Sequence, residues 1–404
     1  MMVGNTFGFN SVQLLTGASE LDSAVKIAPR RLRRLTAGFL PPTIKNPATT
    51  STTSTTSRLD TMPNSDAPQP FAPVVVLTGA SSGIGHATAL AFARAGARLV
   101  LAARGAQALD RVAAECELLD ARALAVPTDV TDADAMRALA DAAIERFGHI
   151  DVWINNAGTG AVGAFDATPI EAHQRVIESN LIGHLNGAHA VLPHFRKQGR
   201  GTLINMISSG GWVATPYAAA YTASQFGLRG FSEALRAELG SLPGVHVCEV
   251  YPAFVDTPGL LHGANYTGKR LRPAPPVLDP RQVADSLVAL AKAPRDVTSI
   301  GSAALPGRLA HAVAPGLTGR VSAWFTNRAL NRADPAPITN GNLFEPSRVH
   351  TIDGGHRTLA TRAAPLAAVA LAGALGLGLL WALRSRRPHQ QGPARSRRAA
   401  GWQG

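Results

Sequence analysis

The sequence predicts an α/β fold with one doubly wound parallel sheet, and three observations support this prediction. Short apolar segments alternate with longer segments of helical apolar spacing from Val74 onward. The first strand-like segment, Val74–Leu77, leads directly into a glycine-rich run, TGASSGIG. The chain has 404 residues, 46% of them hydrophobic, which is enough for a large core. Regular alternation of this kind is typical of a parallel sheet covered by helices on both faces.

The elements are expected within a single domain at residues 62–330. The strands are predicted at residues 74–78, 98–103, 123–127, 151–155, 201–207, 246–251 and 297–301. The helices are predicted at residues 84–95, 106–119, 132–147, 170–195, 217–241 and 280–292. In such folds ligands bind at the carboxyl ends of the strands, near the point where the strand order reverses.

Residues 1–61 differ in composition from the rest of the chain. The stretch Thr49–Ser57 is almost entirely serine and threonine, with prolines on either side, which is typical of disorder. Four arginines between residues 30 and 34 would suit a targeting segment, but two nearby acidic residues weaken that interpretation. We therefore expect residues 1–61 to be disordered, or to lie upstream of a natural start at Met62.

The glycine-rich run joins the first strand to the helical pattern at Ala87–Ala95. Glycines let the backbone turn tightly and approach phosphates, and the helix N-terminus supplies free N–H groups and a positive dipole. Glycine-rich turns are common, but a strand before and a helix after favour a pyrophosphate site. The residues expected to bind the cofactor here are Thr78, Gly79, Ser81, Ser82, Gly83, Ile84 and Gly85.

The second strand ends in Arg104, where chains that bind NAD carry an acid for the ribose 2′-hydroxyl. A guanidinium suits a 2′-phosphate instead, through charge-assisted hydrogen bonds. The sequence therefore favours NADP over NAD as the cofactor. The alternative is an exposed arginine that caps the strand.

The next two strands also end in polar residues. Asp129 follows the third strand, where its carboxylate can meet the adenine amine, although a cap or turn residue explains it equally well. Asn155 ends the fourth strand, and the turn that follows is expected beside the cofactor. That turn consists of Asn156, Ala157 and Gly158.

Three polar residues later in the chain become informative as a set. Tyr221 begins a strong helical pattern that reaches Leu239, and Ser208 lies 13 residues earlier, just after a strand. Asn180 lies within the preceding helical pattern. Each of them singly is more often a core or capping residue than a catalytic one.

Together with the glycine run, these residues make the chain resemble the short-chain dehydrogenase/reductase family over roughly residues 72–302. The resemblance implies a Rossmann-type fold and an oxidoreductase that passes a hydride between a nicotinamide and an alcohol or ketone. It implies that Tyr221 gives or takes the alcohol proton, that Ser208 orients the carbonyl, and that Asn180 holds a water. Residues Pro252 to Thr257 also match the family pattern, and Pro252 and Thr257 would bind the cofactor.

One residue departs from the family pattern, which is Tyr-x-x-x-Lys. Here Gln225 stands in the lysine position, one helical turn after Tyr221. The family's lysine contacts the nicotinamide ribose and lowers the pKa of the tyrosine, whereas glutamine hydrogen-bonds but carries no charge. Two hypotheses follow: a slow or specialised reductase, or an NADP-binding sensor or scaffold with little turnover.

The family resemblance also implies a substrate lid at Pro258–Pro276. Its apolar residues favour a lipophilic substrate, with ordinary packing as the alternative. Those residues are Leu260, Leu261 and Tyr266, and Trp212 and Tyr217 are expected at the mouth. Homodimers or homotetramers through the helices at 170–195 and 217–241 are a further expectation from the family.

The distribution of charge argues against nucleic-acid binding, although the net charge is +12. Residues 1–61 carry seven Lys/Arg and three Asp/Glu, and residues 346–404 carry nine and one. The residues between them carry 23 of each sign, so no basic groove is predicted on the domain. Two cysteines are too few for a disulfide framework.

The C-terminal part predicts a membrane anchor. Residues 331–362 are polar and are interpreted as a linker, and residues 363–383 form an uncharged apolar segment long enough to span a bilayer. A basic tail follows at 384–404. The positive-inside bias would place this tail in the cytoplasm, and the enzyme domain then on the other side of the membrane. Against this, the enzyme domain has no secretory signal and uses a cytosolic cofactor. We therefore expect the enzyme domain to face the cytoplasm, in conflict with the charge bias. A buried core helix at 363–383 is the alternative.

Overall fold

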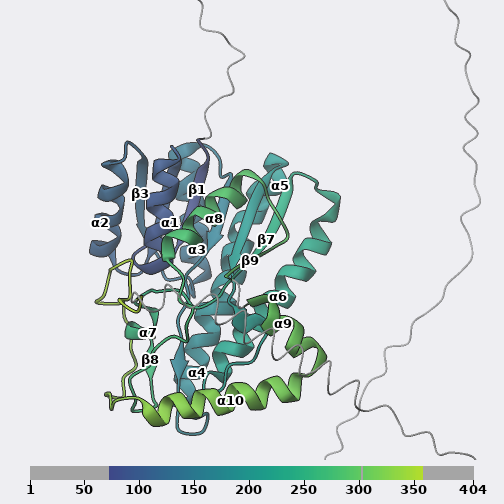
Figure 1. The fold of residues 1–404 in the computed structure, drawn as a ribbon. Coiled ribbons are helices and arrows are strands. Elements are labelled where there is room, and N and C mark those ends of the chain that lie inside the picture. The colour runs from purple at the N-terminus through teal and green to yellow at the C-terminus, as the bar shows by residue number, and fades with distance from the viewer. Residues whose placement is uncertain (1–71, 302–303, 358–404) are drawn as a thin grey trace, which may run out of the picture. The chain divides into compact units, whose positions relative to one another are not determined.

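The computed structural model describes residues 72–301 and 304–357, in which seven parallel strands form the central sheet (Figure 1). The order across the sheet is β3-β2-β1-β4-β6-β7-β9, and it reverses between β1 and β4. A separate parallel pair joins β5 to β8. The central strands are β1 (Val74–Thr78), β2 (Arg98–Ala103), β3 (Arg122–Pro127), β4 (Val152–Asn155), β6 (Gly201–Met206), β7 (Val245–Pro252) and β9 (Val297–Ile300). The small pair is β5 (Ala161–Val162) and β8 (Ala264–Asn265).

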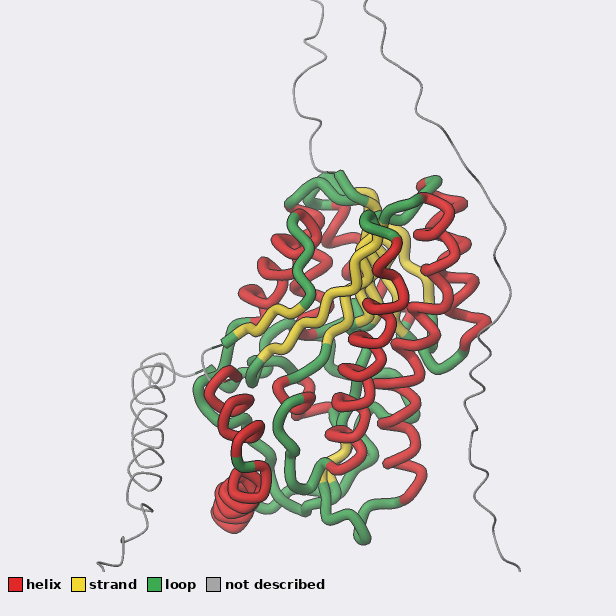
Figure 2. Tube along the Cα trace, turned by 90° about the vertical axis from the view of Figure 1, so that its right-hand side faces the viewer, coloured by secondary structure: helices red, strands yellow, loops and turns green. Residues whose placement is uncertain are grey.

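Helices cover both faces of the sheet, so the sheet is seen edge-on between two helical layers in Figure 2. Each layer closes its own hydrophobic core against the strands. One layer consists of α1 (Gly83–Arg94), α2 (Ala106–Glu117) and α8 (Pro280–Lys292). The other consists of α3 (Ala133–Phe147), α5 (Gly183–Gln198) and α6 (Ala219–Glu238). The predicted doubly wound parallel sheet is thereby confirmed.

The observed elements depart from the expected ones in a few places. The helix expected at 170–195 is α4 (Ile170–Ile177), a π-helical turn (Glu178–Ile182) and then α5. The helix expected at 217–241 begins at Ala219, and its last turn is a 3-10 helix. Elements not expected are β5, β8, α7 (Gly259–His262), α9 (Ala304–Val313) and α10 (Pro315–Arg332).

The segment expected to be a linker folds back onto the domain. Residues 333–357, which we call the strap, lie beside α7 in Figure 1. The strap's Leu343 is fully buried, and Arg357 pairs with Asp256, Asp279 and Asp353. An internal ion-pair network and a buried leucine hold the strap in place, which composition alone does not reveal.

The remaining expectations about the ends of the chain lie outside the described residues. They concern the disordered region at 1–61, the apolar segment at 363–383 and the basic tail at 384–404. Within the part of the chain that the structure describes, no helix combines the length and apolarity needed to cross a membrane.

A buried polar network fixes the second helical layer against the sheet. The side chain of Asn155 accepts a hydrogen bond from Trp153 Nε1 at 2.8 Å and donates one to Asn205 at 3.0 Å. Asn205 in turn donates to Ser232 of α6 at 2.9 Å. Gly187 of α5 lies directly over Asn155, because a Cβ added there would be 2.2 Å from the Asn155 side-chain oxygen. Close packing of α5 on β4 therefore requires a glycine at 187.

Two glycine-to-alanine substitutions inside helices are expected to have opposite effects on stability. Gly187→Ala should destabilise the protein by about 1–3 kcal/mol, because the added methyl has no room. Gly230→Ala is the matched control: it lies inside α6 with nothing within 4 Å of its added Cβ, and should stabilise by about 0.4–1 kcal/mol. Urea denaturation measures both, and a Gly187→Ala protein as stable as the wild type would contradict this packing.

Candidate active site

Hydrogen bonds between Thr78 and Asn156 join the ends of β1 and β4. The Thr78 hydroxyl accepts from the backbone N–H groups of Asn156 at 3.0 Å and of Ala157 at 3.1 Å. The Asn156 amide donates to the Thr78 carbonyl at 3.0 Å and to the Gly79 carbonyl at 3.3 Å. Thr78 therefore fixes the loop after β1 against the loop after β4. These two loops form the floor of a cavity that Thr78 itself does not line.

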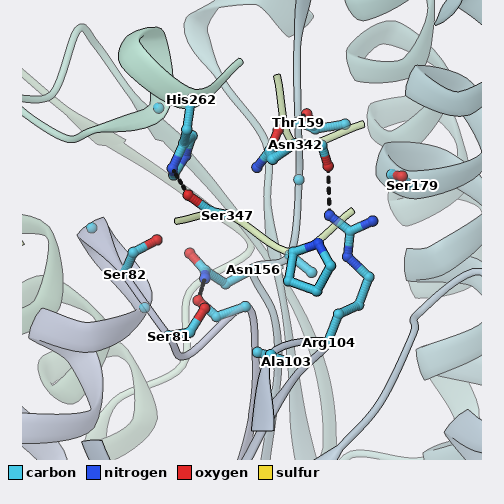
Figure 3. Close-up of a pocket in the computed structure, with 18 of the residues that line it drawn as sticks. Ser81, Ser82, Ala103, Arg104, Asn156, Thr159, Ser179, His262, Asn342 and Ser347 are labelled. Atoms are coloured by element: carbon cyan, nitrogen blue, oxygen red, sulfur yellow. Dashed lines mark hydrogen bonds between the residues drawn. The ribbon is translucent and has the colours of Figure 1, made fainter. Parts of the chain in front are cut away.

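The glycine run forms the floor of a cavity at the carboxyl end of the sheet (Figure 3). Gly79 has a left-handed φ of 68°. A Cβ on Gly85 would lie 2.0 Å from the Gly79 carbonyl oxygen, so a side chain there has no room. The expected residues that line the cavity are Gly79, Ser81, Ser82, Gly83, Ile84, Gly85, Arg104, Asp129, Asn156, Ala157, Gly158 and Thr257.

This cradle fits a dinucleotide. Its glycines let the loop after β1 pack directly against the Asn156 loop and Thr257, and the loop still lines the cavity, where its backbone can meet a ligand. Ser82 lies in the cap position of α1 without a side-chain hydrogen bond to the helix, which leaves the first backbone N–H groups to other partners. In this structure one of them, from Gly83, donates to the carbonyl of Thr351 in the strap at 3.0 Å.

Arg104 points into the cavity and holds the strap (Figure 3). Its guanidinium donates to three strap carbonyls, those of Asn342 at 2.5 Å, Leu343 at 3.1 Å and Glu345 at 3.0 Å. Arg104 is therefore at the predicted place, at the end of β2, with partners that the sequence did not indicate. Burial lowers the pKa of the Arg104 guanidinium, and nearby Asp129 opposes that shift.

Asp129 lies in the same cavity and pairs with Arg175 of α4 at 2.7 Å. Burial disfavours its charged form, but hydrogen bonds from Thr131 and Arg175 outweigh burial and lower the pKa of the carboxyl. One of these donors, the Thr131 hydroxyl, is 2.8 Å away. The carboxylate is thus ionised and held in place beside Arg104.

Tyr221 and Ser208 lie together after the carboxyl end of β6, and neither is among the residues that line the cavity. Ser208 follows β6, Tyr221 lies in the first turn of α6, and their side chains are hydrogen-bonded. Gly210 packs between them, since a Cβ there would be 3.2 Å from the Tyr221 ring and 3.6 Å from the Ser208 hydroxyl. Burial raises the pKa of the Tyr221 hydroxyl, and the hydrogen bond with Ser208 partly offsets this rise.

Asn180 and Gln225 meet at Ser224, which the sequence analysis missed. The Asn180 amide donates to Ser224 at 3.2 Å and to the Thr159 carbonyl at 2.9 Å, while its oxygen accepts from the Thr159 N–H. Gln225 is buried and donates to Ser224 at 3.5 Å. Ser224 also donates to the Tyr221 carbonyl at 2.7 Å. The π-helical turn places Asn180 in this network.

Two residues expected at the site lie in other surroundings. Pro252 ends β7 and pairs with Ile300 of β9. Trp212, expected at the mouth, is buried: its ring stacks on Tyr251 at 3.9 Å and lies beneath the Arg308 guanidinium at 4.6 Å. The expectation for Trp212 is therefore wrong, because an aromatic neighbour and a cation enclose it. Tyr217 reaches outward and donates to Asn327 of α10.

Several neighbours of the candidate site residues were missed by sequence reasoning, some close in the chain and some distant. Arg175, Thr159 and Ser224 carry no motif of their own, although Ser224 sits between the two singled-out residues Tyr221 and Gln225. The strap contributes further cavity residues: Asn342, Pro346, Ser347 and His350. His262 of α7 hydrogen-bonds Ser347 at 2.7 Å (Figure 3).

Comparison with known proteins places this site in a family. Residues 73–262 match the family model for short chain dehydrogenase. Dehydrogenase/reductase SDR family member 7 of Mus musculus is 37% identical over 188 residues, covering 46% of this chain and 56% of the mouse protein. The uncharacterized oxidoreductase YxnA of Bacillus subtilis is 35% identical over 254 residues, covering 61% of this chain and 70% of that protein.

Solved structures show the same fold. An alcohol dehydrogenase from the archaeon Thermococcus sibiricus, complexed with 5-hydroxy-NADP, superposes with a TM-score of 0.50 at 29% identity, covering 56% of this chain and 94% of that one. A short chain dehydrogenase/reductase from Burkholderia phymatum in complex with NAD gives 0.53 at 27% identity, covering 66% and 98%. The chain belongs to the short-chain dehydrogenase/reductase family of oxidoreductases.

Proposed function

We propose that the protein is an NADP-dependent oxidoreductase that transfers a hydride between the nicotinamide and a lipophilic alcohol or ketone. The observation that carries this proposal is the hydrogen-bonded pair of Ser208 and Tyr221, which follows the carboxyl end of β6 in the same sheet whose β1 leads into the glycine cradle. A proton donor and a second hydroxyl at one point are what carbonyl reduction needs. The family supplies the oxidoreductase class, and the residues of this chain supply the finer assignment.

NADP is favoured by the position of Arg104. Its guanidinium lies in the cavity that the glycine run lines, at the end of β2, where the adenosine ribose of a dinucleotide binds. A 2′-phosphate would replace strap carbonyls as the acceptor for some of its N–H groups. The Thermococcus sibiricus relative carries an NADP derivative and the Burkholderia phymatum relative carries NAD, so the arginine decides the proposal.

The side chains have distinct parts in the reaction. The nicotinamide supplies or accepts the hydride when bound. Ser208 orients the carbonyl oxygen, and Tyr221 gives that oxygen a proton in reduction or removes the alcohol proton in oxidation. Asn180 and Ser224 hold the first turn of α6 against the Thr159 loop, which fixes the position of Tyr221. The water that the family resemblance assigns to Asn180 in the proton relay is part of this proposal.

A lipophilic substrate is favoured by the surroundings of Tyr221. Its ring packs in an apolar cluster with Ala220 of its own helix, Tyr266 and Ala264 of the lid region, and Leu343 of the strap. Tyr266 also donates to Asn340 of the strap at 2.7 Å. Because apolar side chains pack against the Tyr221 ring, an apolar substituent on the carbonyl gains more there than a charged one.

A catalytically weak NADP-binding sensor or scaffold is the second candidate, and Gln225 favours it. Among the described residues, no cationic side chain lowers the pKa of Tyr221.

We also propose that residues 363–383 attach the protein to a membrane, with the enzyme domain in the cytoplasm. Association into a homodimer or homotetramer belongs to the same set of proposals.

Replacing Arg104 should separate the two cofactors. Arg104→Gln is expected to weaken NADPH binding by about 10- to 100-fold, because one charged hydrogen-bonding partner of a phosphate is lost. NADH binding should change little. Fluorescence titration gives both dissociation constants. The matched control is Arg229→Gln on the exposed side of α6, where Arg229 pairs with Glu233 at 2.8 Å. Equal losses for NADPH and NADH in Arg104→Gln would refute the 2′-phosphate assignment.

Removing the Tyr221 hydroxyl should stop turnover without stopping cofactor binding. Tyr221→Phe is expected to slow NADPH oxidation with a panel of apolar ketones by at least about 100-fold, while the NADPH dissociation constant is retained. Tyr217→Phe, whose hydroxyl bonds to α10, is the control and should keep the rate. A wild-type protein that binds NADPH but reduces none of these ketones would favour the sensor hypothesis instead.

Introducing the charge that Gln225 lacks should shift the pH profile. Tyr221 must be deprotonated to oxidise an alcohol, and burial raises its pKa, so wild-type oxidation should rise with a midpoint above the ordinary pKa of tyrosine. In Gln225→Lys, an ammonium ~5 Å away at an effective dielectric of ~20 favours the tyrosinate by about 3 kcal/mol, on the order of two pKa units. The midpoint should fall accordingly.

The control for this shift is Gln225→Met, which removes the amide and adds no charge. Its pH midpoint should stay at the wild-type value. The pH dependence of kcat for alcohol oxidation measures all three proteins. Identical midpoints in the lysine variant and the wild type would show that residue 225 does not set the pKa of Tyr221.

A further inference from the structure

Helix α10 presents its apolar side to the outside of the protein. Leu317, Val321, Trp324 and Phe325 recur at i, i+4, i+7 and i+8, so they share one helix face. Their exposed fractions are 53%, 41%, 57% and 54%. In Figure 1 the helix runs along the edge of the molecule below α9, and no residue of α10 is buried.

The side of α10 that meets the domain is mostly polar or small, with Leu330 as its one large apolar residue. Thr318, Ser322 and Thr326 follow one another at four-residue spacing and are all half-buried. Thr318 contacts His311 of α9 at 3.0 Å, and Asn327 accepts the hydrogen bond from Tyr217. An amphipathic helix on a soluble core normally buries its apolar stripe and exposes its polar one. In α10 the polar stripe faces the domain and the apolar stripe faces outward. We therefore expect the apolar face to bind a partner outside the described domain.

Helices α9 and α10 carry charge of a single sign, and the nearest acidic residue along the chain, Asp334, is paired with Arg272 of the lid. Helices α9 and α10 contain four arginines and no aspartate or glutamate. Arg320 and Arg332 are exposed, and Arg328 lies over the ring of Trp324 at 5.6 Å. Further cations come from the lid, where Lys269 bridges to Pro335 just beyond α10. A partner for this face is therefore apolar at its centre and negatively charged around it.

We propose that α10 lies in the interface of a membrane that contains anionic lipids. Tryptophan and phenylalanine on one face with arginines beside them are the composition that binds at the headgroup level. Each cation near an anionic surface adds to the attraction between the helix and that surface. The contact is a lateral one, made by a helix that lies on the bilayer, and it is independent of the apolar segment at 363–383.

A second copy of the chain is a poorer occupant of this face. In a symmetric dimer the same patch meets itself, so Arg320 and Arg328 would face their own counterparts. Neither α9 nor α10 has an acidic residue to pair with them. Like charges brought together in this way cost affinity.

The position of α10 gives the contact a consequence for the enzyme. Tyr217, which bonds to α10, also accepts the backbone hydrogen bond of Gly163 beside the small β5–β8 sheet. On the neighbouring α9, Gly307 packs against Val213, close to the Ser208 loop. A bilayer under α10 would therefore border the lid side of the site, where an apolar substrate arrives. The lipid contact itself does not depend on the proposed reaction.

A dye on α10 tests the contact in the full-length protein. Val321→Cys is labelled with a polarity-sensitive fluorophore and mixed with vesicles of phosphatidylcholine and phosphatidylserine. The two native cysteines should stay unlabelled, because burial raises the pKa of the Cys116 thiol to about 12 and of Cys248 to about 11. Leu118→Cys is the matched control, at an exposed apolar residue that follows α2 and is 85% exposed.

The expected result is a blue shift of the dye at position 321, with loss of intensity when the vesicles carry brominated acyl chains. The dye at position 118 should show neither effect. Equal behaviour of the two dyes would overturn the proposal, whether or not the vesicles capture the protein. A blue shift at position 321 that needs no vesicles and grows with protein concentration would also overturn it, because a second copy would then cover the face.

Discussion

The hydrogen bonds between Thr78 and Asn156 are the constraint on which the site depends. They tie the loop after β1 to the loop after β4, at the point where the strand order reverses. The first loop is the glycine cradle, and the second leads to Thr159, whose backbone binds Asn180. Asn180 reaches Ser224 on the helix of Tyr221. The glycine cradle and Tyr221 are thus positioned by one continuous set of hydrogen bonds across the carboxyl edge of the sheet.

Local sequence patterns predicted the sheet and the residues at its edge, because each depends on neighbours in the chain. The strand at 74–78 and the glycine run carry their own signal in apolar spacing and backbone freedom. Arg104 and Asp129 were singled out because each follows the end of a strand. Their partners, Arg175 and the strap, were not predicted, since both lie far away in the sequence. The expectation that Trp212 lies at the mouth of the site was wrong for the same reason. Its neighbours Tyr251 and Arg308 are distant in the sequence, and they bury its ring.

Arg104 lines the cavity and also binds the strap. Three carbonyl oxygens of residues 342–345 accept its hydrogen bonds, and Thr351 accepts the Gly83 N–H at the start of α1. Both donors are groups that the sequence assigns to cofactor phosphates. The ion pairs of Arg357 hold the far end of the strap through Asp256, next to Thr257 in the cavity wall. If cofactor phosphates bind these donors as we propose, phosphate oxygens and strap carbonyls would compete for the same N–H groups, and cofactor binding would be coupled to the position of the strap.

Hydrogen exchange of the full-length protein, with and without saturating NADPH, tests most directly whether this edge of the sheet holds the cofactor. Backbone amides in the cradle at 78–85 and in the turn at 155–158 should exchange more slowly with NADPH. Exchange in the strap at 342–351 should change as well, because Arg104 and the Gly83 N–H would donate to cofactor phosphates in place of the strap carbonyls. NADPH that binds while all three segments keep their exchange rates would place the cofactor elsewhere and contradict the arrangement of the site.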